Sequence, residues 1–140
     1  MPTTGVFNGT DLIVKVDDKK IGHATSASFT VNADLPDATT KDSSGWAENI
    51  HGLRSFSVSG DGLVDYSDDG TTTQGAVSIR DLILNRTSVT LYWGTETTGD
   101  TIYTASAKCA SIEETAEMES PVSYSFEFTG SGAITKATLT

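Results

Sequence analysis

The segment 55–62 reads Ser-Phe-Ser-Val-Ser-Gly-Asp-Gly, and its first half alternates strictly between small polar and apolar side chains. A period of two is typical of a β-strand with one face on the core and the other in water. We therefore expect the phenylalanine and the valine inside and the three serines outside. The Gly-Asp-Gly that follows predicts a bend or a bulge, since glycine in a strand marks such a site.

The same period recurs along most of the chain, at residues 12–16, 26–33, 89–93, 103–109 and 122–128. Asp17-Asp18-Lys19-Lys20 fits a tight hairpin turn after the first of these runs, and Ser120-Pro121 separates the last two. Neighbouring strands are therefore expected to be antiparallel. The sequence predicts a mainly β fold, an antiparallel sandwich or part-closed barrel.

One segment has helical instead of strand periodicity. Between Gln74 and Arg86, Ala76, Ile79, Leu82 and Ile83 recur at the spacing of one helix face. We expect a single α-helix here, flanking the sheet and covering an open end or face of it.

The long polar loop at about residues 34–51 lacks a strand pattern. It exceeds the ~12 to 15 residues beyond which a structureless connection is usually functional or mobile. It nevertheless carries two large apolar side chains, which a freely solvated loop does not need. We expect this loop to dock on an adjacent subunit or ring, with these candidate contact residues: Asp42, Ser43, Gly45, Trp46 and Ile50.

Length and charge narrow the functional classes. At 140 residues the chain has the size of one domain, 1–140, and its net charge is −10. Its cations are scattered, so it lacks the basic patch that grips nucleic acid. No apolar run approaches the ~18 residues of a membrane span, and the chain opens without a leader pattern, so we expect a protein made in the cytoplasm.

No residue pattern indicates catalysis, a cofactor or a metal. His23 and His51 do not share a ligand spacing, and Cys109 falls on the apolar face of its run, where a small hydrophobe is expected. Residues 65–70 resemble the first half of a calcium loop, but the twelfth position is Ala76 where a glutamate is needed. We expect no enzyme, no cofactor and no metal site.

Several segments together resemble the major tail tube proteins of long-tailed bacteriophages, in particular the siphophage major tail protein family. The resemblance spans nearly the whole chain and rests on the order and spacing of five pieces: residues 9–14, 21–25, 41–46, 57–62 and 128–132. Where the family pattern has Asp-Gly in the first turn, this chain has Asp18-Lys19, which leaves the turn type open.

The resemblance implies a structural virion protein located in the phage tail. It implies hexameric rings that stack into a hollow tube around a tape-measure protein, with tail terminator and distal tail proteins at the ends and DNA later passing through. A strand face of small hydroxyls suits such a pore wall, and net negative charge repels phosphates. The residues expected to face the lumen are Ser26, Ser28, Thr30, Ser55, Ser57 and Ser59.

A second interpretation is a small β-sandwich binding module of a phage particle, directed to carbohydrate or the host surface. Such a module needs two or three exposed aromatic residues near one strand edge. Trp46 lies in the long loop, whereas Trp93 alternates with core residues. The two tryptophans are therefore not expected to share a site.

Overall fold

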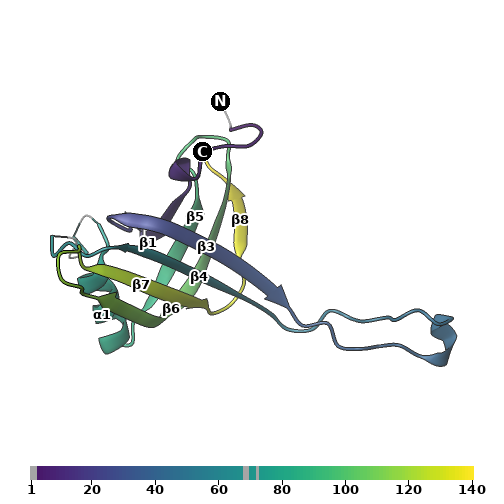
Figure 1. Ribbon diagram of the computed structural model, residues 1–140. Helices are drawn as coiled ribbons and strands as arrows, with labels where there is room; N and C mark the ends of the chain where they lie inside the picture. Colours follow the sequence, from purple (N-terminus) through teal and green to yellow (C-terminus); the bar gives the residue numbers. More distant parts are fainter. Residues whose placement is uncertain (1–2, 68–69, 72) are drawn as a thin grey trace.

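The computed structural model describes residues 3–67, 70–71 and 73–140 of the chain. These residues form one eight-stranded antiparallel sheet and one α-helix, so the expected fold class is confirmed (Figure 1). The strands are β1 (Ile13–Val16), β2 (Lys19–Lys20), β3 (Ala24–Ala33), β4 (Arg54–Leu63), β5 (Ser88–Gly94), β6 (Thr101–Thr115), β7 (Ser123–Gly130) and β8 (Thr135–Thr138). The helix α1 spans Ala76–Leu84, and the short 3-10 helices η1 and η2 span Gly9–Asp11 and Lys41–Ser43.

The sheet bends into two layers because β6 belongs to both. Its first half pairs with β5 and β8, and its second half pairs with β7, with a register shift between Cys109 and Ser111. One layer therefore contains β2, β1, β5 and β8, and the other contains β3, β4 and β7. The ring of Phe29 on β3 lies 5.3 Å from that of Trp93 on β5, so the two layers face each other.

The core lies between these layers and is filled by the inward side chains of the alternating runs. Phe56 and Val58 are buried as expected, together with Leu91 and Phe128. The helix α1 adds Ala76 and Ile79 to the same core, which confirms the predicted flanking helix. Burial of these side chains supplies the main driving force for folding, at roughly 1.5 to 3 kcal/mol for each large one.

The first turn is a two-residue hairpin between β1 and β2. Asp17 and Asp18 both have positive φ, +52° and +66°, which is the signature of a type I′ turn. The Asp17 carboxylate also accepts a hydrogen bond of 2.9 Å from the backbone N–H of Thr90. The predicted hairpin is therefore confirmed, and its turn type does not require glycine.

Two parts of the strand pattern differ from expectation. The apolar face of β3 is mostly exposed, with Phe29 half-buried and Val31 57% exposed, because no strand of the second layer extends beneath its ends. The strand β8 was not expected at all. It pairs with β6 at the edge of the sheet, and all four of its residues are exposed.

The Gly-Asp-Gly of β4 does not itself form a bulge. The irregularity lies on the partner strand β3, between Ala24 and Ser26. The two glycines instead make room for aromatic rings of β7. A Cβ on Gly60 would lie 2.9 Å from Cζ of Phe126, and one on Gly62 would lie 2.9 Å from the Tyr124 ring.

Candidate assembly surfaces

A polar face covers the outer side of the layer formed by β3 and β4. In the β3–β4 register, Ser28 lies opposite Ser59 and Thr30 opposite Ser57. Opposed residues of antiparallel strands project on the same side. The six serine and threonine residues expected on one surface are therefore brought together there: Ser26, Ser28, Thr30, Ser55, Ser57 and Ser59.

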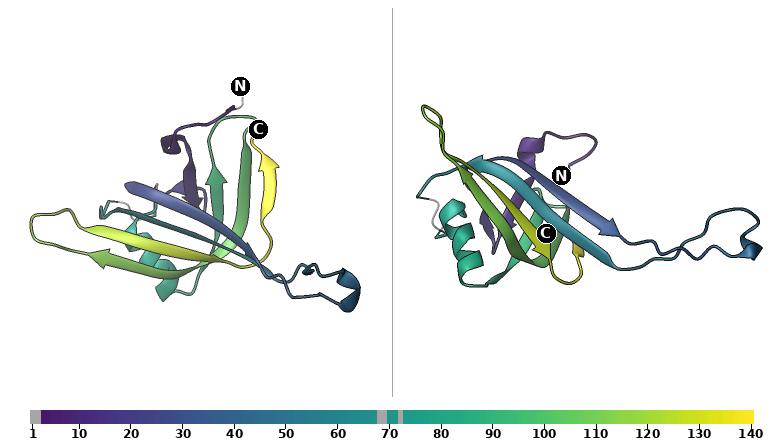
Figure 2. Two further views of the ribbon diagram at one scale, coloured as in Figure 1. Left: turned by 45° about the vertical axis from the view of Figure 1, so that its right-hand side comes forward. Right: turned by 60° about the horizontal axis from the view of Figure 1, so that its bottom comes forward.

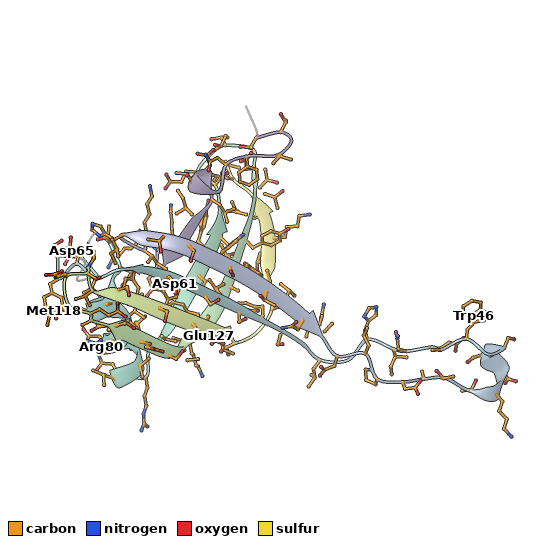
Figure 3. All side chains as sticks on the ribbon, viewed as in Figure 1. Trp46, Asp61, Asp65, Arg80, Met118 and Glu127 are labelled. Carbon is orange, nitrogen blue, oxygen red and sulfur yellow. The ribbon has the colours of Figure 1, made fainter. Side chains whose placement is uncertain are left out.

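The polar face continues across β7 and β6. Asp61 lies opposite both Ser26 and Ser125, and Ser125 lies opposite Glu113. The row beside it runs from Ser59 through Glu127 to Ser111, and the sheet encloses a shallow hollow of about 540 Å³ along these rows. Figure 3 marks Asp61 and Glu127 on two strands of this layer.

The carboxylates of this face were missed by the sequence reading. Asp61, Glu113 and Glu127 lie on it together with one cation, Lys108, which is in register with Thr129. The signal was present, since Glu127 alternates with two buried phenylalanines just as the serines of β4 alternate with Phe56 and Val58. The face is thus hydrated and carries more negative than positive charge.

Residues 34–53 form an extended hairpin arm that continues β3 and β4 away from the body (Figures 1 and 2). Backbone hydrogen bonds join its two sides, from Asp34 N to Leu53 O at 2.8 Å and from Ala38 N to Glu48 O at 2.9 Å. The expected irregular loop is therefore partly ordered as a β-type ribbon. A ribbon holds its tip at a defined distance from the body, which a random loop does not.

The tip of the arm is built around η2. Thr40 caps this turn, and its backbone N–H donates a 3.0 Å hydrogen bond to Oγ of Ser43. Ser43 is accordingly buried within the tip, which gives it an internal role. Ser44 and Gly45 then reverse the chain with φ of +55° and +82°.

The apolar side chains of the arm are solvent-exposed. Trp46 is 78% exposed at the tip (Figure 3). Ile50 is 58% exposed on the returning side, and Leu53, which pairs with Asp34 at the base, is 82% exposed. Asp42 and Gly45 are also exposed. The structure thus brings four of the five candidate contact residues together at the tip, with Ile50 farther back. The sequence pattern did not single out Leu35 and Leu53, the other large hydrophobic residues exposed on the arm.

The β3-β4-β7-β6 layer ends in two free strand edges. Within the described residues, no strand pairs with the outer edge of β3. The pairing of β5 with β6 stops at Lys108, and among the described residues no other strand pairs with that edge of β6 from Cys109 to Thr115. A free edge presents unpaired N–H and C=O groups that readily accept another strand.

A groove opens at the seam between β1 and β3. Its volume is about 690 Å³, and its apolar lining includes Leu12, Val14, Ile21, Ala27 and Phe126. The helix α1 packs against β6, and Arg80 forms an ion pair with Glu114. The C-terminal turn of α1 leaves Ile83 37% and Leu84 70% exposed.

Among the residues that the structure describes, the two histidines and Cys109 lie apart from one another. Burial raises the pKa of the Cys109 thiol to about 11, so it stays protonated at neutral pH. His23 lies 3.6 Å from Asp65, and within the described residues no three His, Cys, Asp or Glu side chains gather as metal ligands. In the segment 65–70, which resembles the first half of a calcium loop, Asp68 and Asp69 lie outside the described residues. No helix in the described parts of the chain is long and apolar enough to cross a membrane.

The exposed aromatic residues do not form a common binding platform. Trp46 lies at the arm tip, whereas Tyr66 directly follows Asp65, which lies at the opposite end of the molecule (Figure 3). The third exposed aromatic residue, Phe7, belongs to the N-terminal segment before η1. Trp93 packs against Phe29 in the core. This arrangement does not favour the carbohydrate-binding interpretation.

Comparison with known proteins gives one family and several structures. A family model described as "Phage tail tube protein" matches residues 6–136. No curated protein sequence matches the chain. Among solved structures, a chain from the virion of a native gene transfer agent particle is similar, with a TM-score of 0.79 and 23% identity over 94% of this chain and 99% of that one.

Two other solved structures have the same fold. A chain from the tail of an empty gene transfer agent particle, computed with C6 symmetry, has a TM-score of 0.78 and 21% identity over 94% of this chain and 99% of that one. The SPP1 tail tube has a TM-score of 0.74 and 12% identity over 95% of this chain and 80% of that one.

Proposed function

Because the chain belongs to the phage tail tube protein family, it is a structural protein of the phage tail and not an enzyme, and we propose that six copies close into a ring. The rings then stack into a hollow tube through which DNA passes during ejection. The single observation that carries this proposal is the pair of free edges on the β3-β4-β7-β6 layer.

Ring closure follows from the direction of the strands at these edges. All pairs in the layer are antiparallel, so β3 and β7 run one way and β4 and β6 the other. Placing β3 of one subunit beside β6 of the next therefore continues the antiparallel order. The contact joins two different surfaces, and such a heterologous contact makes a ring whenever its rotation closes. The C6 symmetry of the similar gene transfer agent tail supports six copies.

Stacking of the rings is assigned to the arm. The arm extends from one end of the β3-β4-β7-β6 layer, along the direction of its strands (Figure 1). Its tip exposes Trp46, and its returning side exposes Ile50. Burying such side chains against an adjacent ring removes apolar surface from water, at roughly 25 cal/mol per Å². The single domain 1–140 is thus proposed to make both kinds of contact.

The lumen is assigned to the polar face. When the layer closes on itself, one of its faces must point to the axis, and the other packs against the second layer of the same subunit along β4, β7 and β6. A wall of hydroxyls with the carboxylates of Asp61, Glu113 and Glu127 stays hydrated and repels phosphate. Proteins that hold DNA bind its phosphates with lysine and arginine side chains, which displaces the counterions condensed on the DNA. A wall without such a cluster of cations lets the DNA slide past.

Other tail proteins complete the assembly. We propose that a tape-measure protein fills the lumen before DNA does, and that tail terminator and distal tail proteins bind the exposed rings at the two ends of the tube. The two ends differ chemically, since one presents the arms and the other the β6–β7 hairpin turns.

Negative-stain microscopy of the purified protein, with Trp46→Ala beside it, tests the proposal. We expect the wild-type protein to form rings or tubes, and Trp46→Ala to shift the population from tubes to rings or monomers. The side chain is 78% exposed, so its loss should leave the free energy of unfolding of the monomer within about 0.5 kcal/mol of wild type.

Two controls define what the result means. Trp46→Phe retains a large apolar ring and should retain more tubes than Trp46→Ala. Lys41→Ala alters an exposed polar side chain of the same tip and should assemble like wild type. Wild-type protein that stays monomeric under all assembly conditions would contradict the proposal, and Trp46→Ala that fails to fold would assign the tryptophan to the core.

A further inference from the structure

The seam groove between β1 and β3 and the exposed turn of α1 lie at opposite edges of the β3-β4-β7-β6 layer. The groove lies behind β3, at one free edge, and α1 lies behind β6, at the other. Both are on the core side of the layer, because Phe126 of the groove and Ile112 of β6 belong to the core set. Ala27 of the groove alternates with Ser26 and Ser28 of the polar face, so it also points to the core side. The polar face is on the other side.

The groove and the helix are also at the same end of the strands. Ser26, Asp61, Ser125 and Glu113 form one row across the four strands. Ala27 of the groove follows Ser26, and Glu114, which pairs with Arg80 of α1, follows Glu113. A neighbour that places β6 beside β3 therefore brings α1 to the mouth of the groove.

We propose that the exposed C-terminal turn of α1 in one subunit fills the seam groove of its neighbour in the ring. Leu84 and Ile83 enter the groove and lie against the parts of its lining that are accessible in the isolated subunit, Leu12 and Ala27, so apolar surface is buried on both partners. The occupant is a second copy of this chain, because the same edge pairing that extends the sheet carries α1 to this place. The inference rests on the proposed ring.

The second layer stops short of β3, and this leaves the groove open for a neighbouring subunit. A sheet that closed completely would leave no space at the seam, and the ends of β3 would be covered by its own chain. Instead Ala27 and other residues of the apolar face of β3 are exposed in the isolated subunit. The neighbour's helix completes the sandwich, so each subunit finishes its core with a part of the next.

Disulfide cross-linking between two single-cysteine variants tests this contact. In a Cys109→Ser background, Leu84→Cys is mixed with Ala27→Cys, assembled, and oxidised. Both positions are exposed in the monomer, so neither change disturbs the core. We expect a disulfide-linked dimer in the assembled fraction. The matched control mixes Leu84→Cys with Thr138→Cys, an exposed position on β8, and should give at most a trace of dimer.

Microscopy of the same samples separates this inference from the ring proposal. Rings or tubes with the 84–27 cross-link and without the 84–138 cross-link support the inference. Rings or tubes without the 84–27 cross-link overturn it and leave the ring intact. If the wild-type protein forms no rings, both proposals fall. As a second measurement, Leu84→Ser should reduce ring formation at least several-fold at equal concentration while the monomer stays folded; unchanged ring formation would also overturn the inference.

Discussion

Gly60 illustrates how one residue fixes the spacing of three strands. A Cβ at this position would lie 2.5 Å from the carbonyl oxygen of Ser26 on β3 and 2.9 Å from Phe126 on β7. The absence of a side chain thus lets the β7 ring lie over the β4 backbone. This close approach, rather than a turn, explains a glycine in the middle of a strand.

Gly60→Ala is expected to destabilise the protein by about 1 to 3 kcal/mol, the usual cost of overpacking. Alanine restricts the unfolded chain and so favours folding by roughly 0.4 to 1 kcal/mol, which is smaller than the cost of moving a backbone carbonyl. Urea denaturation measures the difference. Gly9→Ala is the control, since nothing lies within 4 Å of its Cβ. Equal stability of the two variants would contradict this account of the strand packing.

Asp100 ties the N-terminal segment to the end of the sheet. Its carboxylate accepts hydrogen bonds of 2.5 Å from the backbone N–H of Thr3 and from Oγ1 of Thr95. These hydrogen bonds favour the ionised form and lower the pKa of the Asp100 carboxyl below its ordinary value.

The lowered pKa predicts a pH dependence of stability. The unfolded chain takes up the proton more readily than the folded one, so the contribution of Asp100 is complete above the ordinary aspartate pKa of about 4 and is lost as the pH falls below it. Asp100→Asn should therefore be less stable than wild type at pH 7, with a smaller difference near pH 3. Chemical denaturation at both pH values measures this. A difference that grows on acidification would refute the assignment.

At the scale of elements, the sequence pattern shows which residues share a face but not what covers that face. The alternation in residues 26–33 correctly pairs Phe29 with Val31, yet Val31 stays exposed because the second layer does not reach it. The strand β8 has no apolar alternation that would reveal it in the sequence. Its four residues are exposed, and backbone pairing to β6 holds it in place. Only the path of the whole chain reveals such contacts.

The candidate surfaces were predictable to different degrees for the same reason. The serines of the polar face can be predicted from the period of two within each strand. The arm can be predicted from the length of the loop and from a tryptophan that belongs to no strand pattern. The carboxylates of the polar face depend on the register between β4, β7 and β6, and the groove depends on where two distant strands separate. The register between strands and the gap between two distant strands depend on segments far apart in the sequence, so no local sequence pattern predicts them.

The arm should be separable from the body. Replacing residues 38–48 by Asn-Gly joins Asp37 and Asn49, which already form a bridge, through a two-residue turn. We expect a free energy of unfolding within about 0.5 kcal/mol of wild type, because the exposed arm adds little to the core. Microscopy should show rings without stacked tubes. Tubes of normal length from this variant would remove the arm from stacking.

At the scale of the whole molecule, each surface of the subunit has a different assigned contact. The polar face is assigned to the lumen, the two free edges to the neighbours in the ring, and the arm to the next ring. The net charge of −10 is consistent with a wall that does not retain DNA, because cations are too few and too scattered to hold phosphates.

A cryo-EM map of tubes assembled from the purified protein tests the central claim most directly. The account predicts a wall in which the β3-β4-β7-β6 layers of neighbouring subunits join edge to edge, with Thr30, Ser57 and Glu127 facing the lumen. A map that places this face in a dry interface, or on the outer surface of the tube, would contradict it.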